Sequence, residues 1–273
     1  MTDLTQSGRK DIPTICIINY KTELLTKLCL RSIRKFTQSP YQVIVVDNNS
    51  GDSSLDYLRQ VKWIKLIERP GNLIPNTPAM AHASAMDIGL ENCETDFLIS
   101  MHSDTFVYQE KWLDQLMTPF ADDPMMACTG GGKLDLKPKW EIWLKKCTDY
   151  QEWLRKLNHK NLPRRDFYIR SICCAYRMKY LKEMNLKFTD GFDRGMTAAQ
   201  QMYYDLVAAG YHTRVIPEYE QASCIHHMAH ATMVLNPEFS VRKHTQKKCR
   251  KRLQQVLNSA LTQEILNDDS LDR

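Results

Sequence analysis

Two carboxylates that follow apolar runs are the first residues of the chain that could do chemistry. Asp47 closes the run Gln42–Asp47, and Asp104 comes two residues after His102, just past another apolar run. A carboxylate at the end of a buried strand can accept a hydrogen bond from a nucleobase or bind ribose hydroxyls. A hard divalent cation needs oxygen ligands, and Mg²⁺ or Mn²⁺ is commonly held by one carboxylate together with substrate phosphates. We therefore take Asp47 as a candidate nucleoside contact and Asp104 as a candidate metal ligand.

Three histidines further along the chain are candidates for the same metal centre. His226, His227 and His230 follow a predicted strand and Pro217. If their segment is helical, His226 and His230 share one face at a spacing that metal sites use. The alternative is that one or two of these rings make local hydrogen bonds on a loop, since histidine is also a common polar loop residue.

The N-terminal half alternates between short apolar runs and segments whose apolar residues have helical spacing. One such helix is expected from Pro78 to about Glu94, because Thr77 is a typical N-cap and proline is favoured at the first helical position. The alternation predicts an α/β fold with an open, largely parallel sheet and helices on both faces. The four predicted strands are Thr14–Asn19, Gln42–Asp47, Trp63–Glu68 and Asp96–Met101.

Ligands of such sheets bind outside the carboxyl ends of the strands. A polar cluster follows each of the four runs, so the parallel arrangement predicts that all four clusters lie along one edge. Turn formation by Asp, Asn, Ser and Gly explains any single cluster fully, but four aligned clusters with two carboxylates favour a binding edge. The clusters are Asn19–Tyr20, Asp47–Gly51, Glu68–Asn72 and His102–Asp104.

The second half of the chain is less regular. Strands are expected within residues 125–132, 167–177 and 213–217, and helices at about Glu110–Ala121, Lys139–Leu157, Thr197–Gly210 and Val241–Leu266. The helix Lys139–Leu157 carries Trp140, Trp143 and Trp153. These rings could stack on an acceptor molecule, but core packing is the favoured interpretation because large aromatic side chains dominate cores.

The charge of the chain is concentrated in one segment. The formal net charge is +5, from 37 basic and 32 acidic residues, and Val241–Arg252 holds seven of the basic residues and no acid. Without that segment the balance is 30 against 32, or −2. We therefore expect an anionic partner to bind to this segment or to a small site, and not to the body of the protein.

Composition also bears on class and location. Hydrophobic residues make up 43% and charged residues 25% of the 273 residues, which is typical of a globular chain and unlike a fibrous or disordered one. No run approaches 18 apolar residues, and the polar start lacks the apolar core of a secretion signal. The nine cysteines are scattered without a C-x-x-C pair, which is typical of reduced thiols. These features predict a cytoplasmic protein.

Several segments together resemble the family 2 glycosyltransferases, which have the GT-A fold. The resemblance rests on NYKTELLTKLCLRSI, VDNNSGDSS and DFLISMHSDTFVYQEKWL in the first half, and on GFD at Gly191–Asp193, AAGYHTRVIP and IHHMAHAT in the second. It covers roughly residues 12–232. It implies a GT-A-like, Rossmann-type open mixed sheet, mostly parallel and flanked by helices, with a C-terminal helical extension.

The resemblance implies a division of the chain. A glycosyltransferase domain over 12–235 would have a nucleotide-binding half of about 12–107 and an acceptor half of about 108–235. Residues 1–11 are expected to be disordered or loosely packed, and 236–273 to form a basic helical tail.

The resemblance also implies an activity, the transfer of a sugar from a nucleotide sugar to an acceptor hydroxyl. UDP is the commonest nucleotide in the family, and a glycan or lipid-linked molecule is the expected acceptor. The basic tail could contact an anionic membrane at the inner face, although a solvated helix face explains the same residues. No nucleic acid partner is expected, and the sequence does not predict an oligomeric state. Residues predicted to bind the nucleotide sugar are Asn19, Tyr20, Asp47, Asn49, Asn72, Asp87, His102, Ser103 and Asp104.

The metal site implied by the resemblance departs from the family in one position. His102-Ser103-Asp104 stands where relatives have a D-x-D motif, so an imidazole replaces the first carboxylate. Imidazole is a poorer ligand for Mg²⁺ than for transition metals, which favours Mn²⁺ over Mg²⁺. The predicted ligands are Asp104 and His227, with His102 and His226 as further candidates. Of these, His227 matches a position that completes the metal site in many relatives.

The general base is the least defined part of the site. Relatives usually carry an acidic pair in the helix after G-F-D, and Ala198 and Ala199 occupy those places here. A base is still needed on the far side of the sugar to take the proton of the attacking hydroxyl, in a displacement that inverts the anomeric carbon. Asp193 is the predicted base, and Asp190 or a residue from elsewhere is the alternative.

Three other functions stay open from the sequence. A nucleotidyltransferase on a similar sheet would need the same metal and nucleotide, but its usual glycine-rich basic loop is absent after the first strand. A nucleic-acid-binding protein could act through Val241–Arg252. An inactive relative would explain the missing acidic pair.

Overall fold

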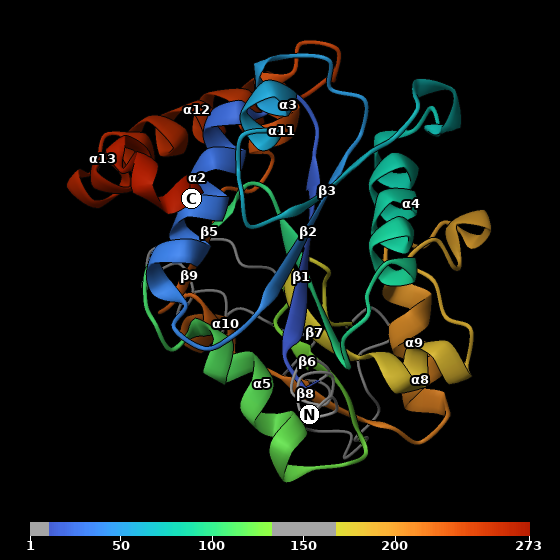
Figure 1. The fold of residues 1–273 in the computed structure, drawn as a ribbon. Coiled ribbons are helices and arrows are strands. Elements are labelled where there is room, and N and C mark those ends of the chain that lie inside the picture. The colour runs from blue at the N-terminus through green and yellow to red at the C-terminus, as the bar shows by residue number, and fades with distance from the viewer. Residues whose placement is uncertain (1–10, 133–167) are drawn as a thin grey trace, which may run out of the picture.

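The computed structural model describes residues 11–132 and 168–273, which form a sheet of seven strands with helices on both faces (Figure 1). The order across the sheet is β3-β2-β1-β4-β7-β6-β8, and β5 and β9 form a separate pair. The strands are β1 Pro13–Asn19, β2 Gln42–Asp47, β3 Lys65–Glu68, β4 Phe97–His102, β5 Thr105–Val107, β6 Met126–Gly130, β7 Cys173–Arg177, β8 His212–Val215 and β9 Ile225–His227.

The predicted parallel half of the sheet is confirmed. Strand β1 runs parallel to both β2 and β4, and β2 runs parallel to β3. Their carboxyl ends therefore meet at one edge, where Asn19 is opposite Asp47 and Ile18 is opposite His102. The antiparallel strand β7 lies between β4 and β6, so the sheet of the described residues is mixed, as expected.

Apolar faces of the helices cover the two sides of the sheet. The helices are α2 Glu23–Phe36, α3 Ser53–Leu58, α4 Pro78–Glu91, α5 Trp112–Asp122, α8 Met178–Glu183, α9 Gln200–Ala208, α10 Glu218–Gln221, α11 Ala231–Leu235, α12 Lys243–Leu257 and α13 Ala260–Asn267, with short 3₁₀ turns at Gly71–Leu73, Phe192–Arg194 and Asp269–Asp272. Residues of α2, α3 and α5 pack on one face of the sheet, and residues of α4, α8 and α9 pack on the other. This burial of apolar surface on both faces is what holds a parallel sheet together.

The C-terminal helices are fastened to the body by a buried arginine. The side chain of Arg31 on α2 is 2% exposed and ion-pairs with Asp269 and Asp272, while it also donates to the carbonyl of Leu266. Figure 1 shows α12 and α13 in red beside α2. These contacts connect α2 to the last residues of the chain, so Arg31 fixes the position of the C-terminal extension.

Several predicted element boundaries were wrong, and in two cases a hydrogen bond accompanies the difference. The segment Val241–Leu266 is two helices, because α12 ends at Leu257 and the side chain of Ser259 caps a new helix by accepting from the backbone N–H of Thr262. The third strand begins at Lys65 and not at Trp63, whose indole N–H donates to the carbonyl of Leu271.

Two further predictions fall outside the described residues. One is the prediction that the N-terminus is disordered or loosely packed, of which residues 1–10 are not described. The other is the tryptophan-rich helix at Lys139–Leu157. The eight cysteines in the described ranges are all buried and free, in agreement with the expected reduced thiols.

Candidate functional site

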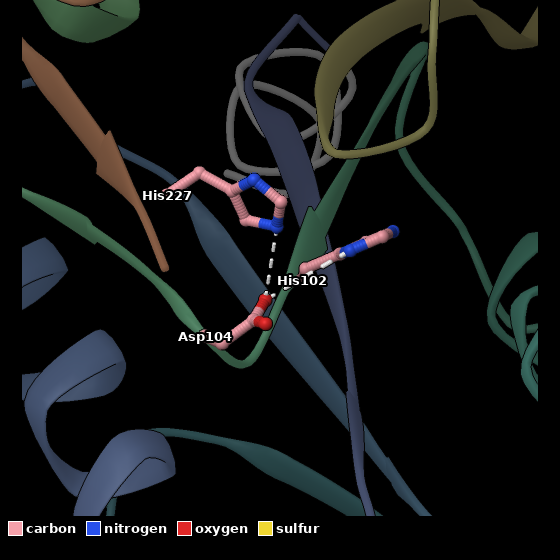
Figure 2. Close-up of side chains that lie close together, drawn as sticks. All are labelled: His102, Asp104 and His227. Atoms are coloured by element: carbon pink, nitrogen blue, oxygen red, sulfur yellow. Dashed lines mark ion pairs between the residues drawn. The ribbon is translucent and has the colours of Figure 1, made fainter. Parts of the chain in front are cut away.

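His102, Asp104 and His227 converge just beyond the carboxyl end of β4 (Figure 2). His102 is the last residue of β4, and Asp104 lies in the turn that leads into β5. Strand β9 pairs antiparallel with β5 and places His227 opposite Thr105. The Nε2 atom of His227 is 3.3 Å from Oδ1 of Asp104, and the Nδ1 atom of His102 is 3.9 Å from the same oxygen. Two segments more than 120 positions apart in the chain thus complete one cluster.

The cluster suits a divalent transition metal. One nitrogen from each imidazole and one carboxylate oxygen lie within 4.8 Å of one another. Ligand bonds of about 2.0–2.2 Å allow two ligands of one ion to lie up to about 4.3 Å apart, and the distances of His102 and His227 to Asp104 fall within that limit. Two nitrogens and one oxygen are a donor set that suits Mn²⁺ or Zn²⁺ better than Mg²⁺.

Burial sets the protonation states of this cluster. It lowers the pKa of His102 to about 3, so the ring is neutral at pH 7 and its nitrogen lone pair is available to a metal. Burial alone would raise the pKa of Asp104, but the charge and hydrogen bond of His227 outweigh it and hold that pKa below its ordinary value. An ionised Asp104 beside a neutral His102 presents a negative charge and a free nitrogen lone pair to a cation.

Of the other two histidines of this segment, neither belongs to the cluster. The helical segment on which a shared face of His226 and His230 depended is absent, because residues 225–227 form strand β9. Successive side chains of a strand point to opposite faces. His226 therefore points away from His227 and stacks on Phe106 with ring centroids 4.9 Å apart. His230 is exposed at the start of α11.

Asp47 is the centre of a buried hydrogen-bond network at the ends of β1 and β2. Its Oδ1 accepts from Nδ2 of Asn19 at 2.7 Å and from Oγ of Ser50 at 2.6 Å, and its Oδ2 accepts from the backbone N–H of Ser50 at 2.9 Å. Asp47 and Asn19 have no exposed surface. The structure thus gives Asp47 internal partners, and its contact with a nucleobase stays a prediction.

The remaining predicted nucleotide contacts at this edge differ in exposure. Asn49 and Asn72 are exposed, and Ser103 is buried. The hydroxyl of Tyr20 donates to Glu238 at 2.8 Å, which ties the end of β1 to the segment before α12.

Asp87 on α4 holds a loop in place. Its two carboxylate oxygens accept from the backbone N–H of Phe188 at 2.6 Å and from the hydroxyl of Thr189 at 2.7 Å. Burial raises the pKa of Asp87, and these hydrogen bonds offset part of that rise. The contacts connect α4 to the loop that leads to Asp193, and a contact of Asp87 with nucleotide stays a prediction.

Asp193 and Asp190, the two candidates for the base, lie on that loop. The carboxylate of Asp190 accepts from the backbone N–H of Lys187 at 2.7 Å. The side chain of Asp193 is 80% exposed and lies 3.8 Å from the guanidinium of Arg194. Ala199, one of the two alanines in place of the usual acidic pair, is buried in the left-handed conformation at φ 62°.

Sequence reasoning missed Arg69, a buried arginine behind the strand ends. It is 6% exposed, and its guanidinium donates to Oδ1 of Asn48 at 2.7 Å and to the carbonyls of Leu73 and Ala81. All its hydrogen-bond partners within residues 11–132 and 168–273 are neutral oxygens. A buried cation without a carboxylate partner attracts anions, and nothing in the local sequence ERPGN marks this residue as buried.

Sequence reasoning also missed His82. It lies on α4 with its ring centroid 4.7 Å from that of His102, in an edge-to-face arrangement. His82 lies four residues after Pro78, and nothing in the sequence distinguishes it from an ordinary polar residue of a helix.

One protein family matches this chain. The model of glycosyl transferase family 2 matches residues 14–185, which is more than half of the chain. The chain belongs to glycosyl transferase family 2. The matched range runs from β1 to beyond β7 and includes His102 and Asp104 of the cluster, and it ends before His227.

Solved structures of glycosyltransferases share the fold of this family 2 chain. A mannosyltransferase, PcManGT from Pyrobaculum calidifontis in complex with GDP-Man and Mn²⁺, is 18% identical with a TM-score of 0.54, over 75% of this chain and 54% of the mannosyltransferase. S. aureus TarS 1-349 is 14% identical with a TM-score of 0.51, over 94% and 75%. The chain thus spans about half the length of the mannosyltransferase. At these identities the likeness shows the GT-A-like fold.

No curated protein matches the chain. Among the helices of residues 11–132 and 168–273, none is long and apolar enough to cross a membrane.

We predict that Asp47→Asn lowers the free energy of unfolding by about 1–3 kcal/mol. The amide replaces an acceptor-only oxygen with a donor, so a buried N–H or O–H of Asn19 or Ser50 loses its partner. Urea unfolding of both proteins measures the difference. The matched control is Asp56→Asn on α3, whose carboxylate is 71% exposed and which should change stability little. Equal effects of the two substitutions would contradict the structural role of Asp47.

Proposed function

We propose that the protein is a metal-dependent, inverting glycosyltransferase that uses a nucleotide diphosphate sugar as donor. The observation that carries the proposal is the cluster of His102, Asp104 and His227 beside the carboxyl ends of the parallel strands. Ligands of open α/β sheets bind at that edge. The family membership and the Mn²⁺ and GDP-Man in the complex of the Pyrobaculum mannosyltransferase support the same conclusion.

A metal bound by His102, Asp104 and His227 would neutralise the negative charge that develops on the leaving diphosphate. The donor atoms favour Mn²⁺, with Mg²⁺ as a weaker substitute, because imidazole nitrogens suit transition metals. Arg69 adds a second positive charge near the strand ends, where it favours binding of the donor phosphates.

The reaction we propose is a single displacement. The oxygen of an acceptor hydroxyl forms a bond to the anomeric carbon while the bond from that carbon to the diphosphate oxygen breaks, so the nucleoside diphosphate leaves on the opposite face. The hydroxyl proton goes to a carboxylate. Asp193 suits this role better than Asp190, because its side chain is largely exposed whereas the carboxylate of Asp190 caps a turn.

The donor we propose is a UDP-sugar, the commonest donor in the family, with a GDP-sugar as the alternative that the Pyrobaculum complex suggests. The acceptor we propose is a glycan or a lipid-linked molecule, in the synthesis of a polysaccharide or glycoconjugate in the cytoplasm.

Helix α12 supports contact with an anionic membrane surface. Its exposed residues include Lys243, Lys247, Lys248 and Lys251, and no acidic residue occurs between Glu238 and Glu264. The opposite face of the helix buries Leu253 in one apolar cluster with residues that flank Asp104 and His227 in the sequence. The basic face of α12 and the residues beside the proposed metal site therefore lie on opposite sides of this helix, and we propose that a lipid-linked acceptor reaches the site from a membrane bound to the basic face.

We predict that Asp104→Asn abolishes Mn²⁺-dependent binding of the donor, because an amide is a much weaker metal ligand than a carboxylate. Titration calorimetry with UDP-sugars and GDP-sugars, with and without Mn²⁺, measures the effect and identifies the nucleotide. The control Asp114→Asn changes an exposed residue of α5 and should bind as the unsubstituted protein does. Undiminished Mn²⁺-dependent binding by Asp104→Asn would refute the proposed site. Release of pyrophosphate instead of a nucleoside diphosphate would indicate a nucleotidyltransferase, and binding without turnover an inactive relative.

We predict that Asp193→Asn lowers kcat by a factor of about 10²–10⁴ and leaves donor affinity unchanged, as expected for loss of a general base. Asp190→Asn is the matched comparison and should lower kcat less. Steady-state kinetics with a nucleoside diphosphate assay separates the two constants. A normal kcat of Asp193→Asn would assign the base to another residue.

We predict that replacing Lys243, Lys247, Lys248 and Lys251 together with glutamine weakens binding to anionic vesicles at least about tenfold. Each basic residue near such a surface contributes about 1 kcal/mol. Cosedimentation with phosphatidylserine vesicles measures binding, and phosphatidylcholine vesicles give the uncharged reference. The control replaces four exposed lysines elsewhere, Lys62, Lys65, Lys111 and Lys179. Equal losses in both variants would leave α12 without a specific role.

A further inference from the structure

His82 is packed against a proposed metal ligand without being one itself. Its ring lies edge-to-face with the ring of His102, with centroids 4.7 Å apart and planes at 72°. The ligand atoms that lie within 4.8 Å of one another belong to His102, Asp104 and His227, and none belongs to His82. His82 comes from α4, whose residues pack in a different apolar cluster from Ile225 of β9.

The two rings share an unmet requirement for hydrogen bonds. The Nε2 atoms of His82 and His102 are both buried, and neither has a hydrogen-bond partner within the described ranges. A buried polar atom without a partner costs about 1–3 kcal/mol. Since a neutral imidazole has one donor and one acceptor nitrogen, two adjacent rings can satisfy each other when one donates to the other.

The orientation of His102 decides which of its nitrogens faces the site. Nδ1 is the atom 3.9 Å from Asp104, so Nε2 is the nitrogen on the far side of the ring (Figure 2). A metal-binding histidine almost always donates its other N–H to an acceptor, which fixes both the tautomer and the direction of the ring. Without such an acceptor, no hydrogen bond of Nε2 fixes the direction of the His102 ring.

We propose that His82 is the positioning residue of this centre: when a metal occupies the cluster, a small rotation of the two adjacent rings lets Nε2 of His82 accept the Nε2–H of His102, a bond that the described ranges do not contain without the metal. That bond then holds Nδ1 of His102 toward Asp104 and His227. This inference rests on the proposed function in one respect, the binding of a divalent metal by the cluster. It adds a residue of α4 to the centre. It also links metal binding to the helix whose carbonyl at Ala81 accepts from Arg69.

Two substitutions separate the hydrogen bond from simple packing. His82→Phe keeps an aromatic ring against His102 but removes both nitrogens. His82→Gln removes the aromatic ring but keeps a side-chain oxygen that can accept. A packing role predicts that phenylalanine is the better substitute, whereas the positioning role predicts that glutamine is.

The readout is affinity for Mn²⁺ alone, measured from the electron paramagnetic resonance signal of the free ion on addition of protein. We expect His82→Phe to weaken Mn²⁺ binding by about 10–100-fold, the usual effect of losing the hydrogen-bond partner of a metal ligand. His82→Gln should stay within about threefold of the unsubstituted protein. Thermal unfolding without metal establishes that both variants fold.

The control is His212→Phe, which changes a histidine that is 60% exposed and paired with Asp123. It should bind Mn²⁺ as the unsubstituted protein does. If His82→Phe binds Mn²⁺ normally, or if phenylalanine preserves affinity and glutamine does not, the positioning role is overturned while the metal site stands. If the unsubstituted protein itself fails to bind Mn²⁺, the metal-dependent function and the role of His82 are both overturned.

Discussion

The contact between Asp104 and His227 is the interaction on which the site depends. It joins the turn after β4 to the short strand β9, with Oδ1 of Asp104 3.3 Å from Nε2 of His227. The pairing of β5 with β9 holds both residues in place. Because Asp104 is buried, its negative charge needs a positive or polar neighbour, and His227 meets that need here. The pairing also brings the C-terminal part of the chain to the edge where the parallel strands end. A divalent cation would bind at the point where the two parts meet.

The sequence predicted the strands that carry the site well, because unbroken apolar runs indicate strands that are buried on both faces of a sheet. Runs such as Gln42–Asp47 contain only apolar residues between polar ends, as strands buried on both faces do, and the parallel alternation follows from the helices between them. Because ligands of open α/β sheets bind outside the carboxyl ends of the strands, the sequence also predicted that Asn19, Asp47 and Asp104 lie along one edge. The role of His227 could be predicted only from the family resemblance, since no local pattern connects residues 104 and 227.

What the sequence did not reveal depends on long-range packing. His226 and His227 are equivalent in the sequence, and only the pairing of β9 with β5 turns one toward Asp104 and the other onto Phe106. His82 and Arg69 lie on segments of ordinary polarity, and their burial follows from how α4 sits on the sheet. The break between α12 and α13 depends on one serine cap, a signal that competes with strong helical periodicity on both sides.

The most direct test is a crystal structure of the protein grown with Mn²⁺ and a nucleoside diphosphate. Anomalous scattering from manganese locates the ion independently of any fitted side chain. The account predicts one peak bonded to Asp104, His227 and His102, with the diphosphate completing its coordination and the nucleoside lying over the ends of β1 and β2. A nucleotide bound elsewhere, or a peak that none of these three side chains contacts, would contradict it.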